Sequence, residues 1–268
     1  MMGSAGGKTM YRRSHLTVVQ IVVLCLFLAS VQYCRDHEQE MADKDFEAAL
    51  KEDTSAANAL TSEERAEGWE LLFDGTSLDH WRGFKQQGIP IGWVIRGGAI
   101  HFSGGEQGGD IISREQYQDF ELKVEWRVSE GGNSGIFFHV SEDFDRAWES
   151  GPEMQVLDND RHRDGSKPET RAGTNYALHP ASQEVVKPAG EWNQFGLIVN
   201  GAHVEHWVNG KEIVGYELWS EDWKERVAKS KFAAMPAYGQ SKTGHIALQD
   251  HGDPVWFRAI KIRRLNSE

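Results

Sequence analysis

The chain has 268 residues, of which 39% are hydrophobic and 26% are charged, a composition that is ordinary for a globular protein and excludes a largely disordered one. Its formal charge of -12 disfavours binding to nucleic acid or to anionic lipid through a diffuse positive field. The 28 glycines and 10 tryptophans indicate many turns and half-buried strands, so we expect an all-β protein.

Residues 1–34 are predicted to be an export signal. A basic stretch without acids precedes the apolar run LTVVQIVVLCLFLASV (16–31), which is the order of a secretory signal. A retained membrane anchor is the alternative, although the run is short for a bilayer. Cys34 is a candidate lipid-accepting cysteine of a lipoprotein, but Tyr33 stands where such signals carry a small residue. The expected location is the periplasm or the outer membrane.

Residues 35–67 are predicted to form an acidic, partly helical linker. DKDFEAALKE shows a weak helical spacing of its apolar residues, and Thr61 or Ser62 is a candidate N-cap for a second short helix. The sequence period then changes to that of strands, so we expect the folded domain to span residues 68–266.

Short strands bounded by Gly, Asn or Asp follow one another through this domain. DFELKVEWRV (119–128) alternates strictly, with apolar side chains on one face and charged side chains on the other. Asn209 and Gly210 lie between two apolar runs, which is a strong hairpin signal. SEDWKERVAKS (220–230) reads as a short helix with Ser220 as N-cap. Many strands without crossover helices predict a jelly-roll β-sandwich of two antiparallel sheets.

Polar side chains collect on the outward faces of several of these strands. NSGIFFHV (133–140), GPEMQVLD (151–158) and GHIALQDHG (244–252) each present amides, imidazoles or carboxylates. If the three strands are neighbours, their outward faces form a groove. Its expected lining is His139, Glu153, Gln155, Gln249 and His251, joined by Glu125. Convergent donors and acceptors of this kind hold small neutral polyols.

Other chemical motifs are weak or missing. GGAIHFSGGEQGGD (97–110) is glycine-rich but lacks the strand-turn-helix frame and the Lys-Ser/Thr ending of a phosphate loop. The sequence has no HExxH, no cysteine cluster and no GxSxG. LDNDRHRDG (157–165) is dense in acids and reads as a solvated loop, with an oxygen-ligated divalent ion at Asp158 or Asp160 as the alternative.

Eight longer segments, which follow one another along residues 68–265, are more informative together than any of them is alone. They are GWELLFDGTSLDHWRG, GNSGIFFHV, GPEMQVLDND, AGTNYAL, KPAGEWNQFGLIVNG, VEHWVNGKEIV, GHIALQDHG and VWFRAIKIRRL. Together they resemble the 3-keto-disaccharide hydrolase family. The resemblance implies a concanavalin A-like jelly roll and a saccharide substrate that a partner sugar 3-dehydrogenase first oxidises at C3. It also implies bond cleavage by elimination across C1 and C2 followed by hydration, with a divalent metal ion in some members.

This chemistry assigns expected roles to the groove residues. A ketone at C3 acidifies the C2 proton, so a carboxylate or imidazole can remove it. Glu153 or His139 is expected to be that base, and Asp158 to support the site or to bind an ion. The expected substrate-binding residues are Glu125, Gln155, Tyr176, Lys187, Gln249 and His251. Of these, Tyr176 or Lys187 is expected to assist the departing oxygen.

Two other functions are compatible with the same residues. A conventional two-carboxylate glycoside hydrolase would use Glu125 and Glu153 as acids that face each other. A non-catalytic carbohydrate-binding module would need a groove of stacked aromatics, with Trp81, Trp93 and Trp148 as the candidates, and would depend little on the acids.

Overall fold

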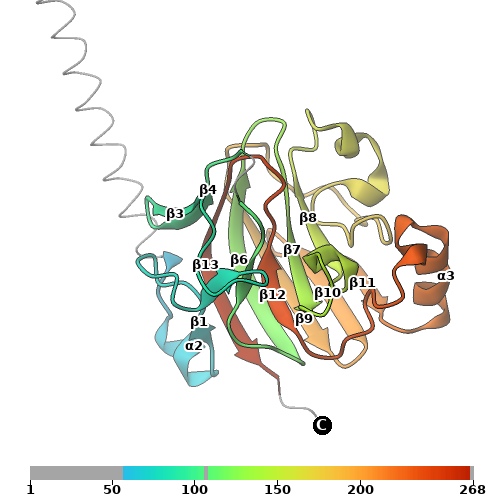
Figure 1. Ribbon diagram of the computed structural model, residues 1–268, viewed down its shortest axis with the longest axis horizontal. Coiled ribbons are helices and arrows are strands. Elements are labelled where there is room, and N and C mark those ends of the chain that lie inside the picture. Colours follow the sequence, from blue (N-terminus) through green and yellow to red (C-terminus); the bar gives the residue numbers. More distant parts are fainter. Residues whose placement is uncertain (1–56, 106–107, 266–268) are drawn as a thin grey trace, which may run out of the picture. The chain divides into compact units, whose positions relative to one another are not determined.

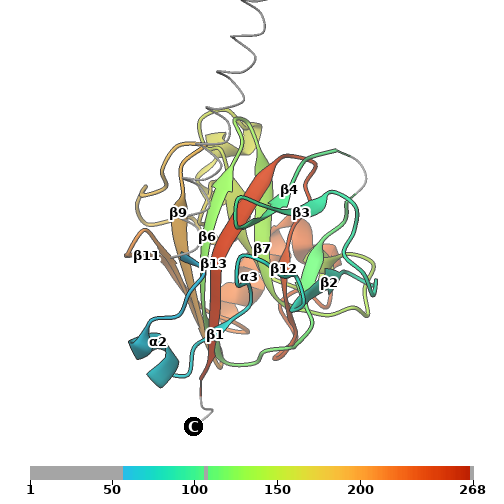
Figure 2. The ribbon, with the colours of Figure 1, turned by 90° about the vertical axis from the view of Figure 1, so that its left-hand side faces the viewer.

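The computed structural model describes residues 57–105 and 108–265. These residues form two antiparallel sheets packed face to face, which confirms the predicted all-β sandwich (Figures 1 and 2). The export signal and most of the linker lie outside the described residues. Within the described part of the chain, no helix is both long and apolar enough to cross a membrane.

The larger sheet has eight strands in the order β11-β10-β9-β6-β13-β4-β3, with β1 also paired to β13. Its strands are β1 (Glu70–Leu71), β3 (Trp93–Arg96), β4 (Ala99–Phe102), β6 (Phe120–Val128), β9 (Asn193–Asn200), β10 (His203–Val208), β11 (Lys211–Glu217) and β13 (Val255–Arg264). The smaller sheet has five strands in the order β2-β5-β12-β7-β8. They are β2 (Trp81–Gly83), β5 (Ile111–Ser113), β7 (Asn133–Val140), β8 (Glu153–Leu157) and β12 (His245–Leu248). The three strands expected to carry the groove, β7, β8 and β12, are neighbours, which is the condition on which the expected groove depends.

The core lies between the two sheets and follows from alternation along the strands. In β6, apolar residues such as Phe120 and Leu122 are buried, while the intervening charged residues face outward. Ile136 of β7 and Leu248 of β12 belong to the same buried cluster, from the opposite sheet. Each such side chain contributes roughly 1.5–3 kcal/mol through burial. A register slip by one residue would expose the whole row, so this core fixes which side chains face outward.

The outer face of the five-stranded sheet is also enclosed. Every residue of β7 and β8 is buried, in contrast to the half-buried pattern of β6. The chain after β8 returns along its edge, because Gly173 N donates to Gln155 O and Tyr176 N donates to Glu153 O. A second apolar cluster lies on this face and consists of Ile112, Phe137, Val140, Ala147 and Ala247, with Phe84 and Trp148 packed against it. Polar side chains here therefore lie in partly apolar surroundings.

Residues 57–67, at the end of the predicted linker, pack on the eight-stranded sheet. Helix α2 (Ser62–Ala66) begins at Thr61, whose side chain accepts a hydrogen bond from Glu64 N while the Glu64 carboxylate accepts one from Thr61 N. The buried Asn58 amide bonds two backbone groups, one between β3 and β4 and one within β13. These contacts fix α2 beside β13.

The remaining helices and the hairpin agree with the sequence pattern. Helix α3 (Glu221–Lys229) follows Ser220, whose hydroxyl accepts from a backbone N–H of the first turn. Asn209 and Gly210 join β10 to β11 with positive φ at both residues, as a type I′ turn requires. Short 3-10 helices lie in the loops at Ala147–Glu149, Arg163–Ser166, Pro168–Thr170 and Lys231–Ala234.

Candidate active site

The candidate site is centred on Gly135, in the outer face of the five-stranded sheet. Gly135 of β7 pairs with Gln155 of β8, and its carbonyl on the other side accepts a hydrogen bond from Gln249 N (2.9 Å). The carboxyl of Glu153 lies over this glycine, since a Cβ built at Gly135 would stand 2.4 Å from Glu153 Oε1. A glycine inside a strand often marks a close approach of this kind. Gly135 thus makes the room that the carboxyl uses.

Glu153 is enclosed, and its carboxyl has no partner among the described residues. The residue is 6% exposed, and within residues 57–105 and 108–265 its side chain forms no hydrogen bond or ion pair. Burial raises the pKa of Glu153 to about 8; the charge of Lys231 opposes this rise, while Asp110 and Asp164 reinforce it. The carboxyl therefore holds its proton at neutral pH and is an unusually strong base once ionised.

Asp110 supplies a second carboxyl with perturbed acidity. It directly precedes β5, whose Ile111 pairs with Leu248 of β12, next to Gln249. Burial raises the pKa of Asp110 to about 6. The backbone N–H of Asp250, which donates to Asp110 Oδ1 (3.0 Å), opposes the rise, while the Asp250 carboxylate reinforces it. The charge of Asp110 also contributes to the raised pKa of Glu153, so the two carboxyls lie within electrostatic range of each other.

Tyr176 and Lys231 approach Glu153 from the loops. Tyr176 Oη donates to Asp164 Oδ2 (3.3 Å), and burial, with the charges of Asp164 and Glu153, raises the pKa of Tyr176 to about 12. Lys231 is exposed at the surface, but its Nζ turns back to 4.2 Å from the centroid of the Tyr176 ring. Burial lowers the pKa of Lys231, and the carboxylates of Glu153 and Asp164 oppose that change. A proton donor and a cation therefore lie within electrostatic range of the Glu153 carboxyl.

Three amides near Gly135 have acceptor atoms that are unused among the described residues. Gln155 Oε1, Gln249 Oε1 and Asn133 Oδ1 are buried and accept no hydrogen bond from the described residues. Gln155 Nε2 donates to a loop carbonyl, and Asn133 Nδ2 donates to His251 Nε2 (3.3 Å). Burial lowers the pKa of His251, which keeps it a neutral acceptor. An unpaired buried acceptor costs about 1–3 kcal/mol, and a ligand hydroxyl would relieve that cost.

Part of the predicted residue set is therefore brought together. Glu153, Gln155 and Gln249 share the outer face of neighbouring strands, as expected from their alternation. Tyr176 borders this face through its backbone bond to Glu153, and His251 borders it through Asn133.

The predicted place of His139 in the groove is wrong. Its φ is 52°, at a register shift between β7 and β12, so the regular alternation of β7 ends before it. Its Nε2 donates to Gln118 O (2.8 Å), and its ring packs against Phe120 and Phe138. The imidazole therefore faces the end of the core and not Glu153.

The predicted place of Glu125 is also wrong. It lies in β6 of the eight-stranded sheet, where its carboxylate accepts from Arg258 Nε (2.7 Å) and Gln194 Nε2 (3.2 Å). Glu125 and Glu153 are thus on the outer faces of opposite sheets. A two-carboxylate mechanism with these residues facing each other is excluded by this geometry.

Asp158 and Lys187 line a separate small pocket of about 90 Å³. The carboxylate of Asp158 accepts from Gly131 N (2.7 Å) and Asp160 N (3.1 Å), and so braces the turn after β8. Lys187 Nζ donates to Trp192 O (3.1 Å). The structure does not place either side chain with Glu153.

The described residues do not form a ready metal centre. Among residues 57–105 and 108–265, no three His, Cys, Asp or Glu side chains are grouped so that they could hold one ion. Both oxygens of Asp158, one of the two expected ligands, are engaged by backbone N–H groups. The side chains as arranged do not fit the divalent ion that the family resemblance implies.

The tryptophans expected of a binding module are not arranged as one. Trp81 and Trp93 are 0% and 4% exposed and belong to the core between the sheets. Trp148 packs against the apolar cluster that includes Phe137. The three rings do not form a row open to a glycan.

The sequence analysis missed Asp110, Asp164 and Lys231. Asp110 ends the glycine-rich segment that was considered only as a phosphate loop, and Asp164 lies in the acid-dense loop after β8. The acid density of the loop after β8 is the signal that could have found Asp164, whereas the segment before Asp110 carries no such signal. Lys231 follows α3 without any local pattern, because only the fold brings it to Tyr176.

Comparison with known proteins decides the family. A family model described as 3-keto-alpha-glucoside-1,2-lyase-like domain matches residues 68–263. The chain belongs to this family. A curated relative from Bacteroides thetaiotaomicron, named 3-keto-disaccharide hydrolase, is 36% identical over 231 residues, which cover 75% of this chain and 80% of the relative. The resemblance inferred from the sequence segments is confirmed.

Solved structures of related proteins share the fold of this 3-keto-alpha-glucoside-1,2-lyase-like domain. A candidate glycosyl hydrolase from Parabacteroides distasonis is 36% identical, with a TM-score of 0.73, covering 78% of this chain and 99% of that chain. A second one from the same organism is 25% identical, with a TM-score of 0.55, covering 74% of this chain and 99% of that chain. Both cover the described sandwich.

Proposed function

We propose that this protein cleaves the glycosidic bond of 3-keto-glycosides, including 3-keto-disaccharides. Membership of the family and the name of the curated relative support an enzyme that acts on 3-keto sugars. The observation that carries the mechanism is the Glu153 carboxyl, which is enclosed, free of hydrogen bonds within the described residues, and raised in pKa to about 8. Such a group is suited to move a proton to and from carbon.

The first step is removal of the C2 proton by ionised Glu153. The C–H electron pair passes to the C2–C3 bond, and the C3 ketone becomes an enolate. The positive charge of Lys231, which acts on Glu153 and Asp164, stabilises the developing oxyanion. The amide oxygens of Gln155 and Gln249 accept hydrogen bonds from the sugar hydroxyls and so orient C2 toward the base.

The second step expels the oxygen at C1. The enolate re-forms the C3 ketone, a C1–C2 double bond appears, and the C1–O bond breaks. Tyr176 gives its proton to the leaving oxygen, because its pKa of about 12 keeps the phenol protonated until a strongly basic oxygen appears.

The last step is hydration of the resulting enone. Water gives a proton to the Tyr176 phenolate, and its oxygen bonds to C1. Glu153, whose carboxyl proton exchanges with solvent once the alcohol has left, gives a proton to C2. Both residues regain their starting state, and the net reaction is hydrolysis to an alcohol and a 3-keto sugar. The Glu153 carboxyl acts in both the elimination and the hydration, since a base with a raised pKa is also an effective proton donor at neutral pH.

The cellular setting is part of the proposal. The basic and apolar order of residues 1–34 supports export, with Cys34 as the candidate lipid anchor. The required ketone must come from an oxidation at C3, so we propose that a sugar 3-dehydrogenase acts upstream.

The test is turnover of a 3-keto-disaccharide compared with the same disaccharide before oxidation. We expect the purified enzyme to release a 3-keto monosaccharide from the first and nothing from the second, because only the ketone makes the C2 proton acidic. Equal turnover of both sugars would contradict the elimination route.

A further inference from the structure

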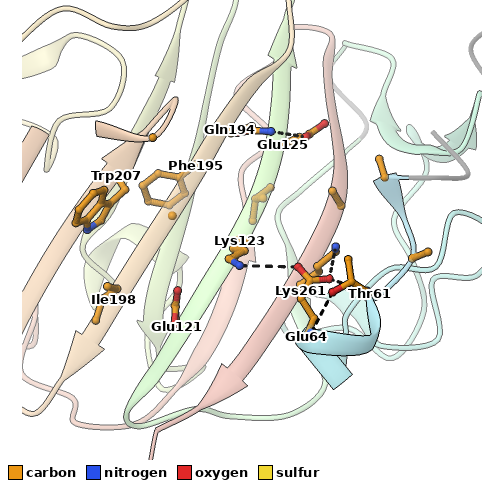
Figure 3. A pocket seen from close by; sticks show the side chains of 16 residues that line it. Thr61, Glu64, Glu121, Lys123, Glu125, Gln194, Phe195, Ile198, Trp207 and Lys261 are labelled. Atoms are coloured by element: carbon orange, nitrogen blue, oxygen red, sulfur yellow. Dashed lines mark hydrogen bonds and ion pairs between the residues drawn. The ribbon is translucent and has the colours of Figure 1, made fainter. Parts of the chain in front are cut away.

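A second pocket lies on the other side of the sandwich, on the outer face of the eight-stranded sheet. Its volume is about 620 Å³, which is within the range of small-ligand sites. Figure 3 shows its two ends, with Trp207 on one side, Thr61 and Glu64 of the α2 region on the other, and Lys123 between them. Both sheets and the core between them separate it from Glu153.

A strand glycine, Gly196, also lines this pocket. Trp207 of β10 pairs with Gly196 of β9, Gly196 pairs with Lys123 of β6, and Lys123 pairs with Lys261 of β13. In this row Gly196 contributes no side chain. A Cβ built on it would stand 3.3 Å from Trp207 Cβ, so the Trp207 side chain lies close to the glycine, and both residues line the pocket together with Lys123. A glycine inside a strand weakens it, and its presence often marks a place where a ligand approaches.

Trp207 presents a fixed aromatic surface to this space. Its Nε1 donates to Glu205 Oε2 (2.7 Å), which holds the ring orientation. The residue is partly exposed, and no other ring or cation of the described residues stacks on its indole. Lys123 turns the other way, with its Nζ 4.1 Å from the centroid of the Trp69 ring and 3.8 Å from Glu64. The indole is therefore available to a flat, weakly polar ligand.

The charges around the pocket are already paired. Glu64 binds Lys261 (2.8 Å), Glu125 binds Arg258 (2.7 Å), and Glu121 binds Arg263. Such a lining offers many donors and acceptors but little net charge, which favours a neutral ligand over an ion. Gln194, which donates to Glu125, adds an amide at the rim.

We propose that this pocket is a second saccharide-binding site, for a neutral sugar of about disaccharide size. One sugar face stacks on Trp207 above Gly196, and the hydroxyls bond the paired side chains around it. The site has no group with the unpaired, perturbed acidity of Glu153, so it binds without cleaving. It holds unoxidised as well as oxidised sugar, because nothing in it requires a ketone. The proposal goes beyond the proposed function and does not depend on it.

The experiment measures binding of unoxidised maltose, cellobiose and trehalose to the full chain by saturation-transfer NMR and calorimetry. We expect at least one of them to bind with a dissociation constant of roughly 1 mM. Trp207→Ala and Gly196→Val should each weaken that binding by roughly tenfold or more, the first by removing the indole and the second by pressing on the Trp207 side chain and displacing it. Glu153→Gln should bind like wild type, since the candidate active site is on the opposite face.

A matched control is Trp219→Ala, which removes a half-buried tryptophan outside the pocket and should leave binding unchanged. Thermal melting shows whether each variant is folded. If Trp207→Ala does not fold, Gly196→Val still tests the proposal. Unchanged binding in both pocket variants would overturn the proposal. Loss of binding in Glu153→Gln alone would also overturn it. So would a result in which uronic-acid disaccharides, measured in parallel, bind and the neutral disaccharides do not. Failure of 3-keto-sugar turnover would not bear on any of these results.

Discussion

Both outer faces of the sandwich carry carboxylates beside a strand glycine, but the neighbours of those carboxylates differ. On the eight-stranded sheet, Glu125 and Glu121 are paired with arginines of β13. On the five-stranded sheet, Glu153 lies over Gly135 with no partner among the described residues, and the nearby charge of Asp110 makes its ionisation harder. The first arrangement is suited to binding, and the second to moving protons.

The difference shows that the presence of a carboxylate does not by itself indicate a role in proton transfer. The residue paired with it on the neighbouring strand decides whether its charge is neutralised. Arg258 pairs with Glu125 in the register of β6 and β13, so the charge of Glu125 is neutralised where it stands. The register partner of Glu153 is Phe137, an apolar residue. A carboxyl beside an apolar partner, in a covered sheet, loses hydration without gaining a cation.

The largest expected effect comes from Glu153→Gln. The substitution keeps the shape but removes the base, so kcat on a 3-keto-disaccharide should fall by roughly 10²–10⁴. Glu217→Gln, on the exposed edge strand β11, is the matched control and should stay within about twofold of wild type. Wild-type turnover in Glu153→Gln would show that the outer face of the five-stranded sheet does not supply the base.

Tyr176→Phe should give the next largest effect, and the effect should depend on the leaving group. A 3-keto-glucoside of glucose needs a proton on its departing oxygen, whereas one of p-nitrophenol does not. We expect a loss of roughly 10–100-fold for the sugar leaving group and much less for the phenol. Equal losses with both substrates would indicate that Tyr176 only supports the loop through Asp164.

Stability should respond with opposite signs on the two faces. The folded pKa of Glu153, about 8, lies above its ordinary value of 4.5, so the unfolded chain releases this proton first and stability falls as pH rises between these values. Glu153→Gln should therefore melt higher than wild type at pH 8, by on the order of 2 kcal/mol or roughly 4–8 °C, with the gain vanishing near pH 4.5. Glu125→Gln breaks a half-buried pair and should melt lower, by about 1–3 kcal/mol. Equal signs in the two variants would contradict the comparison.

The smallest effect concerns the pH profile. Because Glu153 must be ionised to accept the C2 proton, kcat/KM should rise with pH to a plateau above about 8. Lys231 lowers the pKa of Glu153, so Lys231→Met should move the midpoint to higher pH. A midpoint that stays in place, or that moves to lower pH, would mean that Lys231 does not act on the base.

The sequence predicted the sheets and one side of the candidate site because both depend on alternation. Glu153, Gln155 and Gln249 face outward for the same reason that Met154 and Leu248 face inward. Alternation shows which face of its own strand a side chain occupies, but not which of the two sheets contains that strand. For this reason the sequence could not show that Glu125 lies in the other sheet from β7, β8 and β12. Alternation also fails at a bulge, and the positive φ of His139 is not encoded in any local pattern.

The remaining parts of the site come from loops that meet only in the folded chain. Asp110 precedes β5, while Asp164 and Lys231 come from short 3-10 helices far apart in the sequence. Their approach to Glu153 is set by how the chain after β8 and after α3 covers the five-stranded sheet. Loop contacts of this kind have no sequence period, so residue type alone could not group them.

The most direct test of the central claim is the fate of hydrogen at C2 when the reaction runs in D₂O. If Glu153 removes this proton and later returns one, the 3-keto monosaccharide released by wild type should carry deuterium at C2 at the earliest time points, ahead of the slow exchange of an enzyme-free control. NMR of the quenched product measures this. Product that keeps its original hydrogen at C2 would contradict the account, because direct hydrolysis never breaks that bond.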